Sequence, residues 1–512
     1  MALNDITINK GQSGLGRPLE GSDYISGLLF YTASLPSGFT SSNRTKAVFS
    51  LAQAVSLGIV NTGVDETKSA CKIVIAGTPA IGDTLTITYT GIDGAVNVLS
   101  AHALLSGEQT SATTAAAAWV VGINNNTINT GFTATSSTGT ITLTTKSGEG
   151  VFPNTGTPYA VTVTGGSTAA LTQPTGAGGT VLGVASDINI LYYHVSEFFR
   201  MQPKGKLWVG VYATADVGTF ASITLMQNIA SGEILQMGIY QKSTAFATSQ
   251  ITAIQAVCAA LETVNKPLVT ILGAELSATS DITTLANNLH SFSSANVSVT
   301  IAQDGAAVGS KLYKATGKSI TNVGQVLGSI ALAKVSESIA WFGKFKASAT
   351  ELDTLAFCNG QLYTAIPDNA ITNLDNLGFM FLRKISDLAG SFHNRPYTCV
   401  SLTNDYAFVY SNRTFYKARK NVRATVLPAL GSPIKVNSDG TLAPDSINYF
   451  KSLANQGIDN LLRNEELSNY QVIIDPTQNV LSTGLLTITV RLLPLGVADF
   501  ITINLGFTLN LN

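Results

Sequence analysis

Charged side chains are scarce in this sequence. Lysine, arginine, aspartate and glutamate make up 12% of the 512 residues, against about 25% in a typical soluble protein, whereas 45% are hydrophobic. The polar surface must therefore consist largely of threonine, serine, asparagine and glycine. With 30 basic and 31 acidic residues the formal net charge is -1, which gives no electrostatic reason to bind nucleic acid or an anionic membrane. A chain with so little net charge is prone to associate.

Cysteines and long apolar runs are also sparse. The four cysteines, Cys71, Cys258, Cys358 and Cys399, lie far apart and form no C-x-x-C motif, so the sequence predicts neither a zinc cluster nor a dithiol redox site. The first residues lack the basic stretch and apolar core of a signal peptide, and no run of about 18 apolar residues occurs. We therefore expect no membrane insertion, and a chain that is kept in the cytoplasm where it is made.

Few groups could carry catalysis. The four histidines, His102, His194, His290 and His393, stand alone without a carboxylate at metal-ligand spacing. The strongest nucleotide-binding candidate is the triplet Gly317, Lys318 and Ser319, but Leu312 occupies the position where a phosphate-binding loop needs its first glycine. We therefore expect no cofactor, no metal and no enzymatic activity.

Residues 69–181 differ in composition from the sequence on either side. Only six charged residues, among them Lys72 and Asp83, lie in this threonine-, glycine- and alanine-rich stretch. Apolar residues alternate with polar ones around Ile73, Leu85, Ile141 and Val161, and turn residues bound each run, which predicts half-buried antiparallel strands. One helix is expected over residues 111–126. We interpret 69–181 as an inserted β domain on the surface.

The sequence on both sides of the insertion predicts an α/β domain, residues 33–68 and 182–394. A helical pattern runs through Val48, Leu51, Ala52 and Val55. After residue 186, four apolar strands recur about every 30 residues, which is the length of a βαβ unit. They start at Leu207, Ile234, Leu268 and Val297. A helix is expected over 249–264 and a long buried one over 322–342. Together these elements predict a parallel, Rossmann-like α/β layer.

The sequence predicts a strand at each end of the chain. Leu3, Ile6 and Ile8 alternate before a glycine-rich run, so residues 1–32 are expected to form an arm. At the other end Ile501, Ile503, Leu505, Phe507, Leu509 and Leu511 alternate up to the terminus. A chain end normally frays unless it is docked, so this strand is expected to have a partner. Between them, residues 445–467 carry a helical apolar stripe.

A cluster of cations lies in the segment from residue 395 onward. Five basic residues occur within eleven positions with no acid among them: Arg413, Lys417, Arg419, Lys420 and Arg423. A solvated face is one interpretation. The other is a contact with an acidic surface of a partner, while phosphate binding is disfavoured in a chain that is neutral overall.

From residue 394 onward the sequence resembles the C-terminal part of contractile phage tail sheath proteins, which also occur in phage-derived contractile injection systems. The resemblance is carried by the basic stretch, the helix that follows it, a strand pair around VIIDPTQNV and TGLLTITVRLL, and the terminal pattern P-x-G-x-x-x-F-I-x-I-x-L. The order of the α/β elements and the inserted β domain agree with it.

The resemblance implies a structural subunit that polymerises with itself as stacked hexameric rings around an inner tube. Contraction of this array would drive the tube through a target cell envelope. Implied partners are the tube protein and the baseplate and tail terminator proteins, and the implied location is the virion tail, assembled in the host cytoplasm. Residues 395–512 would form a tube-facing polymerisation domain, and both terminal strands would be exchanged between subunits. The implied fold is α/β plus β in several domains, with an α+β C-terminal domain.

Two other functions remain open from the residues alone. A virion decoration protein or glycan-binding adhesin would need an aromatic platform in the inserted domain, where Trp119, Phe132, Tyr89, Phe152 and Tyr159 are available. A nucleotide-dependent enzyme built on the α/β layer is disfavoured by Leu312.

Overall fold

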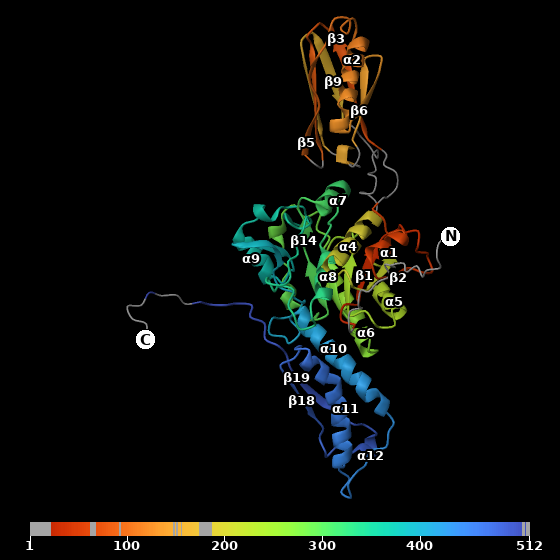
Figure 1. The fold of residues 1–512 in the computed structure, drawn as a ribbon, viewed down its shortest axis with the longest axis vertical. Helices are drawn as coiled ribbons and strands as arrows, with labels where there is room; N and C mark the ends of the chain where they lie inside the picture. The colour runs from red at the N-terminus through yellow and green to blue at the C-terminus, as the bar shows by residue number, and fades with distance from the viewer. Residues whose placement is uncertain are drawn as a thin grey trace, which may run out of the picture.

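The computed structural model describes residues 22–503 and 507, apart from 62–67, 92–93, 147–148, 150–151, 155 and 174–186. An α/β body lies between the inserted β domain at one end of the molecule and a helical C-terminal segment at the other (Figure 1). The predicted strand residues Leu3, Ile6, Ile8, Leu505, Leu509 and Leu511 lie outside the described residues.

A six-stranded sheet forms the centre of the body, in the order β13-β12-β11-β1-β10-β2. Its strands are β1 (Ser26–Tyr31), β2 (Thr45–Val48), β10 (Leu207–Tyr212), β11 (Gln236–Tyr240), β12 (Val269–Gly273) and β13 (Val297–Thr300). Neighbouring strands are parallel except for β2, which pairs antiparallel with β10 at one edge. The four strands predicted from apolar runs after residue 186 are therefore confirmed, and they pair in parallel.

Helices cover both faces of this sheet. On one face the core contains α5 (Ala221–Ile229) and α6 (Thr248–Thr263), and on the other it contains α1 (Leu51–Ser56), α4 (Asp187–Met201), α7 (Val308–Thr316) and α8 (Val323–Leu332). Within β1, Leu29 belongs to the first core, whereas Leu28 and Phe30 belong to the second. Burial on both sides explains why these strands read as continuous apolar runs.

The remaining elements of the body extend the layer beyond β13. They comprise β14 (Ala302–Asp304) paired with β15 (Leu355–Phe357), β16 (Leu382–Ile385) paired with β17 (Leu388–His393), and α9 (Asp368–Asn376). These short antiparallel pairs join the larger of the two sheet-covering cores.

Two boundaries near the N-terminus differ from the prediction. The arm expected over residues 1–32 cannot include β1, because this strand is completely buried between β10 and β11. The helix predicted from the pattern that begins at Val48 also starts later than expected. Val48 ends β2, and α1 begins only after Ser50, whose hydroxyl accepts a hydrogen bond from the N–H of Gln53.

The helix expected over residues 322–342 is wrong beyond Leu332. The backbone turns extended at Ala333, where ψ is 141°. The buried Arg413 guanidinium donates hydrogen bonds to the carbonyls of Ala333 and Lys334 at 3.2 to 3.3 Å. A residue from a distant segment thus satisfies carbonyls at the end of the helix, which no local pattern could reveal.

The inserted domain has its own core and two antiparallel sheets. One has the order β6-β7-β3-β9 and the other β5-β4-β8. The strands are β3 (Ala70–Gly77), β4 (Thr84–Gly91), β5 (Gly94–Ala103), β6 (Thr133–Ser137), β7 (Thr140–Thr144), β8 (Tyr159–Thr164) and β9 (Ser167–Thr172), with helices α2 (Ala112–Asn125) and α3 (Thr127–Thr130) between β5 and β6. The predicted strands and the predicted helix over 111–126 are confirmed.

Four aromatic residues of this domain are part of its core. Trp119, Tyr89, Phe132 and Tyr159 are all buried, and the three rings other than Trp119 pack against one another. These four residues therefore form no exposed platform for a sugar ring.

The C-terminal segment begins with a helical hairpin. Its elements are α10 (Val409–Val426), α11 (Pro444–Arg463), β18 (Asn469–Ile473), α12 (Val480–Thr483) and β19 (Thr489–Leu493). The predicted stripe of α11 is buried at Phe450, Ala454, Ile458 and Leu461. Strands β18 and β19 pair antiparallel and lie against the helices. Figure 1 shows the chain leaving this segment after β19 as an extended tail.

Candidate interaction surfaces of the C-terminal segment

Helix α10 carries the predicted cation cluster, and its first cations point inward. Arg413 is buried and donates hydrogen bonds to the carbonyls of Ala333, Lys334 and Asp23. Burial lowers the pKa of its guanidinium to about 10. This residue joins α10 to the body and to the segment before β1.

Lys417 and Arg419 are held by acids from distant segments. Lys417 forms ion pairs with Asp23 at 2.5 Å and with Glu466 at 2.7 Å. The Arg419 guanidinium pairs with the Glu262 carboxylate at 2.6 Å and also donates to the Glu262 carbonyl. Arg413, Lys417 and Arg419 thus hold the hairpin onto the body, and a contact of the cluster with a partner stays a prediction.

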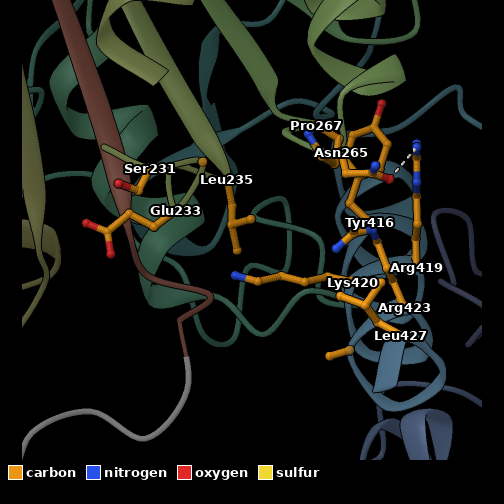
Figure 2. Close-up of a pocket in the computed structure, with 12 residues that line it drawn as sticks. Ser231, Glu233, Leu235, Asn265, Pro267, Tyr416, Arg419, Lys420, Arg423 and Leu427 are labelled. Carbon is orange, nitrogen blue, oxygen red and sulfur yellow. Dashed lines mark hydrogen bonds between the residues drawn. The ribbon is translucent and has the colours of Figure 1, made fainter. Parts of the chain in front are cut away.

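Lys420 and Arg423 differ from the other three. Both are exposed, and within the described part of the chain neither forms a side-chain hydrogen bond or ion pair. They line a cavity of about 460 Å³ between α10 and the loop that precedes β11. Figure 2 shows Lys420 reaching into this cavity from α10, with Glu233 and Leu235 on the opposite side. Two cations thus remain available for an acidic group.

The tail after β19 exposes large apolar side chains. Phe500 is 83% exposed, Ile501 77% and Ile503 74%. Residues 494–503 form no strand, although the sequence alternates as a strand does. In the described residues, therefore, the predicted terminal strand lacks the ladder partner that would bury its apolar face.

The small sheet of β18 and β19 offers edges for such a strand. The two strands pair only with each other among the described residues. Val472 and Val490 lie opposite one another, as do Tyr470 and Leu492, and Tyr470, Val490 and Leu492 pack toward the helices. A strand added at either outer edge would extend this hydrophobic face.

The rejected nucleotide candidate has a structural role. Gly317 ends α7 in the left-handed conformation. The N–H of Ser319 donates to the Glu275 carboxylate, and its hydroxyl donates to the Cys358 carbonyl. The Glu275 carboxylate thus accepts a backbone N–H that a phosphate-binding loop would direct at its phosphate.

Two of the four histidines, His194 and His393, are completely buried. Burial lowers the pKa of His194 and of His393 to about 3. Across the described ranges, no group of three or more histidine, cysteine, aspartate or glutamate side chains is arranged to hold a metal ion. The described residues likewise contain no helix long and apolar enough to cross a bilayer.

Sequence reasoning missed the acids that pair with the cluster. Lys417 and Asp23 are separated by 394 positions, and Arg419 and Glu262 by 157. No local spacing signals such pairs, because they depend on where α10 packs against the body.

Comparison with known proteins gives two family matches and several similar structures. The family described as DUF2586, N-terminal domain, matches residues 121–395, and DUF2586, C-terminal domain, matches residues 405–512. No curated protein matches the chain.

The similar solved structures are contractile tail sheath proteins. The anti-feeding prophage helical sheath in its contracted state has 15% identity and a TM-score of 0.44, over 62% of this chain and 81% of that one. The contracted sheath of an extracellular contractile injection system, PVC, has 14% identity and a TM-score of 0.41, over 62% and 80%. A sheath tail protein from Listeria innocua has 9% identity and a TM-score of 0.40, over 93% and 96%. With family matches over both the body and the C-terminal segment, the chain belongs to the DUF2586 family.

Proposed function

We propose that this chain is a structural subunit of a contractile tail sheath. It polymerises as stacked hexameric rings around an inner tube, and contraction of the array drives the tube through a target cell envelope. The observation that carries the proposal is the tail: at the end of a sequence that resembles sheath C-termini, Phe500, Ile501 and Ile503 lie exposed without a ladder partner.

Strand exchange between subunits would remove this apolar surface from water. Burying one large apolar side chain stabilises a contact by about 1.5 to 3 kcal/mol, and each ladder hydrogen bond adds about 1 kcal/mol. The edges of β18 and β19 in a second copy would receive the tail strand. The N-terminal strand at Leu3, Ile6 and Ile8 would be exchanged in the same way. A link of this kind holds subunits together while their domains change orientation.

The other surfaces fit this role. Lys420 and Arg423 at the cavity beside α10 would meet an acidic patch of the tube or of a neighbouring subunit. The inserted domain, with its separate core, would lie on the outside of the particle. Buried interface would supply the work of contraction, so the role needs neither nucleotide nor catalytic residue. Baseplate and tail terminator proteins would bind the two ends of the array.

Truncation tests the proposal. Deleting residues 2–16 or residues 499–512 should abolish tubes in negative-stain microscopy and leave a folded monomer with nearly unchanged helix content by circular dichroism. Ordered tubes from both truncated chains would contradict strand exchange.

Point substitutions sharpen this test. Replacing Ile501 and Ile503 together by serine should also prevent tubes, because both exposed side chains belong to the apolar face of the tail strand. Thr502→Ser, between them on the opposite face, is the matched control and should assemble normally.

A further inference from the structure

Arg395 touches the tail at the point where the tail leaves the body. Its guanidinium carbon lies 4.4 Å from the ring centroid of Phe500, and its Nε lies 3.8 Å from a carboxylate oxygen of Asp499. A cation over an aromatic face and an opposite charge beside it both attract the tail segment. Two consecutive residues of an otherwise exposed tail are thus held by one side chain.

The body holds Arg395 in place from the other side. Its Nη1 donates to the hydroxyl of Tyr397 at 3.2 Å, and its guanidinium also lies over the Tyr397 ring. The Tyr397 hydroxyl in turn donates to Asp375 of α9, which also accepts a hydrogen bond from Asn394. Tyr397 is buried, and burial raises the pKa of its hydroxyl to about 12. Arg395 is therefore fixed to the rigid core and not to another surface loop.

The tail has a second point of attachment before this contact and is exposed after it. Before it, the Pro494 carbonyl accepts a hydrogen bond from Ser468 at the end of the β18–β19 sheet. Between the two contacts, the tail and residues 336–343 line an open groove of about 780 Å³. After Phe500 the apolar residues Ile501 and Ile503 are exposed, and the tail runs away from the body (Figure 1).

We propose that Arg395 is a positioning residue for assembly: it holds Asp499 and Phe500 and thereby sets where, and in which direction, the apolar strand leaves its own subunit. This inference rests on the proposed function, since its purpose is to present the strand to a second copy of the chain. A tail held at its base loses less conformational freedom on docking than one free from residue 494 onward, so the contact lowers the concentration needed for assembly.

Limited proteolysis measures the contact without assembly. Chymotrypsin needs an extended, mobile segment around its cleavage site, so the Arg395 contact should slow cleavage after Phe500 relative to cleavage after Phe507 in the same tail. In the full chain, kept at a concentration at which light scattering detects no polymer, Arg395→Ala should raise this cleavage ratio about threefold. Asp499→Asn, a change in the tail that leaves the body intact, should raise it less.

Arg383→Ala is the matched control. Arg383 lines the same groove and lies over the Phe342 ring, 5.1 Å from its centroid. It should leave the cleavage ratio unchanged. An unchanged ratio in Arg395→Ala, or an equal rise in Arg383→Ala, would overturn the inference.

Assembly provides the second measurement. Arg395→Ala should raise the threshold concentration for tube formation about threefold without abolishing tubes, and Arg395→Lys, which keeps the charge but not the planar guanidinium, should fall between it and the parent. If truncation of residues 499–512 abolishes tubes while Arg395→Ala leaves the threshold unchanged, the positioning role is wrong. If the truncated chains still assemble, strand exchange fails as part of the proposed function, and the contact at Arg395 is judged by proteolysis alone.

Discussion

At the scale of single residues, a few buried or partly buried charged side chains join segments that are far apart in the chain. Arg413 of α10 binds carbonyls from the end of α8 and from the segment before β1. Glu351 accepts hydrogen bonds from the first N–H groups of α7, at 3.2 Å from Val308 and 3.5 Å from Gly309. Both side chains form hydrogen bonds with backbone groups, so replacing either one should change the free energy of unfolding.

Arg413→Ala should lower the free energy of unfolding by about 1 to 3 kcal/mol, because the carbonyls of Ala333, Lys334 and Asp23 lose the donor that the buried guanidinium supplies. Arg423→Ala, on the same helix but exposed, is the control and should change stability by less than about 0.5 kcal/mol. Urea unfolding followed by circular dichroism measures both. Equal effects of the two substitutions would contradict the structural role of Arg413.

Glu351 should make stability depend on pH. Burial, followed by the charges of Asp304 and Glu197, raises its pKa from 4.5 to about 7. Between pH 4.5 and about pH 7 the folded chain keeps a proton on Glu351 that the unfolded chain has released. The free energy of unfolding therefore falls as pH rises through this range.

Glu351→Gln removes this dependence because glutamine stays neutral. After allowance for solvent screening, the variant should be more stable than the parent by about 1 kcal/mol at pH 8, and the difference should vanish near pH 4. Urea unfolding across this pH range measures it. Glu465→Gln, at an exposed carboxylate, should show no such trend, and a difference independent of pH in Glu351→Gln would refute the assignment.

At the scale of elements, α10 separates its cations by direction. Arg413, Lys417 and Arg419 bind the body, whereas Lys420 and Arg423 face the cavity. One helix can therefore hold the hairpin in place and still present charge to a partner.

Charge reversal at Lys420 and Arg423 should weaken association with purified tube protein, or with a neighbouring subunit, by roughly tenfold at low salt. The effect should shrink as salt is added, because exposed charges are screened. Lys451→Glu, at an exposed cation on α11, is the control. Binding assays at two salt concentrations measure both effects. If neither the affinity nor its salt dependence changes, the two cations face only solvent.

At the scale of the whole molecule, the inserted domain has a hydrophobic core of its own. Its buried residues, from Cys71 to Tyr159, form one core that includes no residue of the body. We therefore expect its two sheets and two helices to fold without the body.

Replacing residues 69–181 by a short Gly-Ser linker should leave the body folded and the tubes intact. The expected readout is tubes of smaller outer diameter in negative stain. Loss of all polymer in a variant with the helix content expected for the body would contradict the assignment of this domain to the outside.

The elements that the sequence determined are those with strong local signals. Continuous apolar runs predict β10 to β13 because strands buried on both faces need no polar side, and alternation predicts β3, β4, β7 and β8 because one face of each meets water. The sequence likewise identified the cluster of cations in α10 and the apolar residues of the tail.

The features that the sequence could not predict depend on contacts between segments that lie far apart in the chain. The sequence places β1 in an arm, yet the sheet takes it between β10 and β11. Helix α8 ends at Leu332, and Arg413 donates hydrogen bonds to the carbonyls of Ala333 and Lys334 that follow it. The same helix packs closely on α4, because a Cβ on Gly324 would lie 2.1 Å from the His194 carbonyl oxygen.

The same reason separates the five cations of the cluster. Sequence spacing treats them alike, but Lys417 and Arg419 find acids up to 394 positions away, in Asp23, Glu262 and Glu466. A helix pattern states which residues are charged and which share a side. Which side meets the body, and hence which charges remain for a partner, is set by packing that joins residues far apart in the chain.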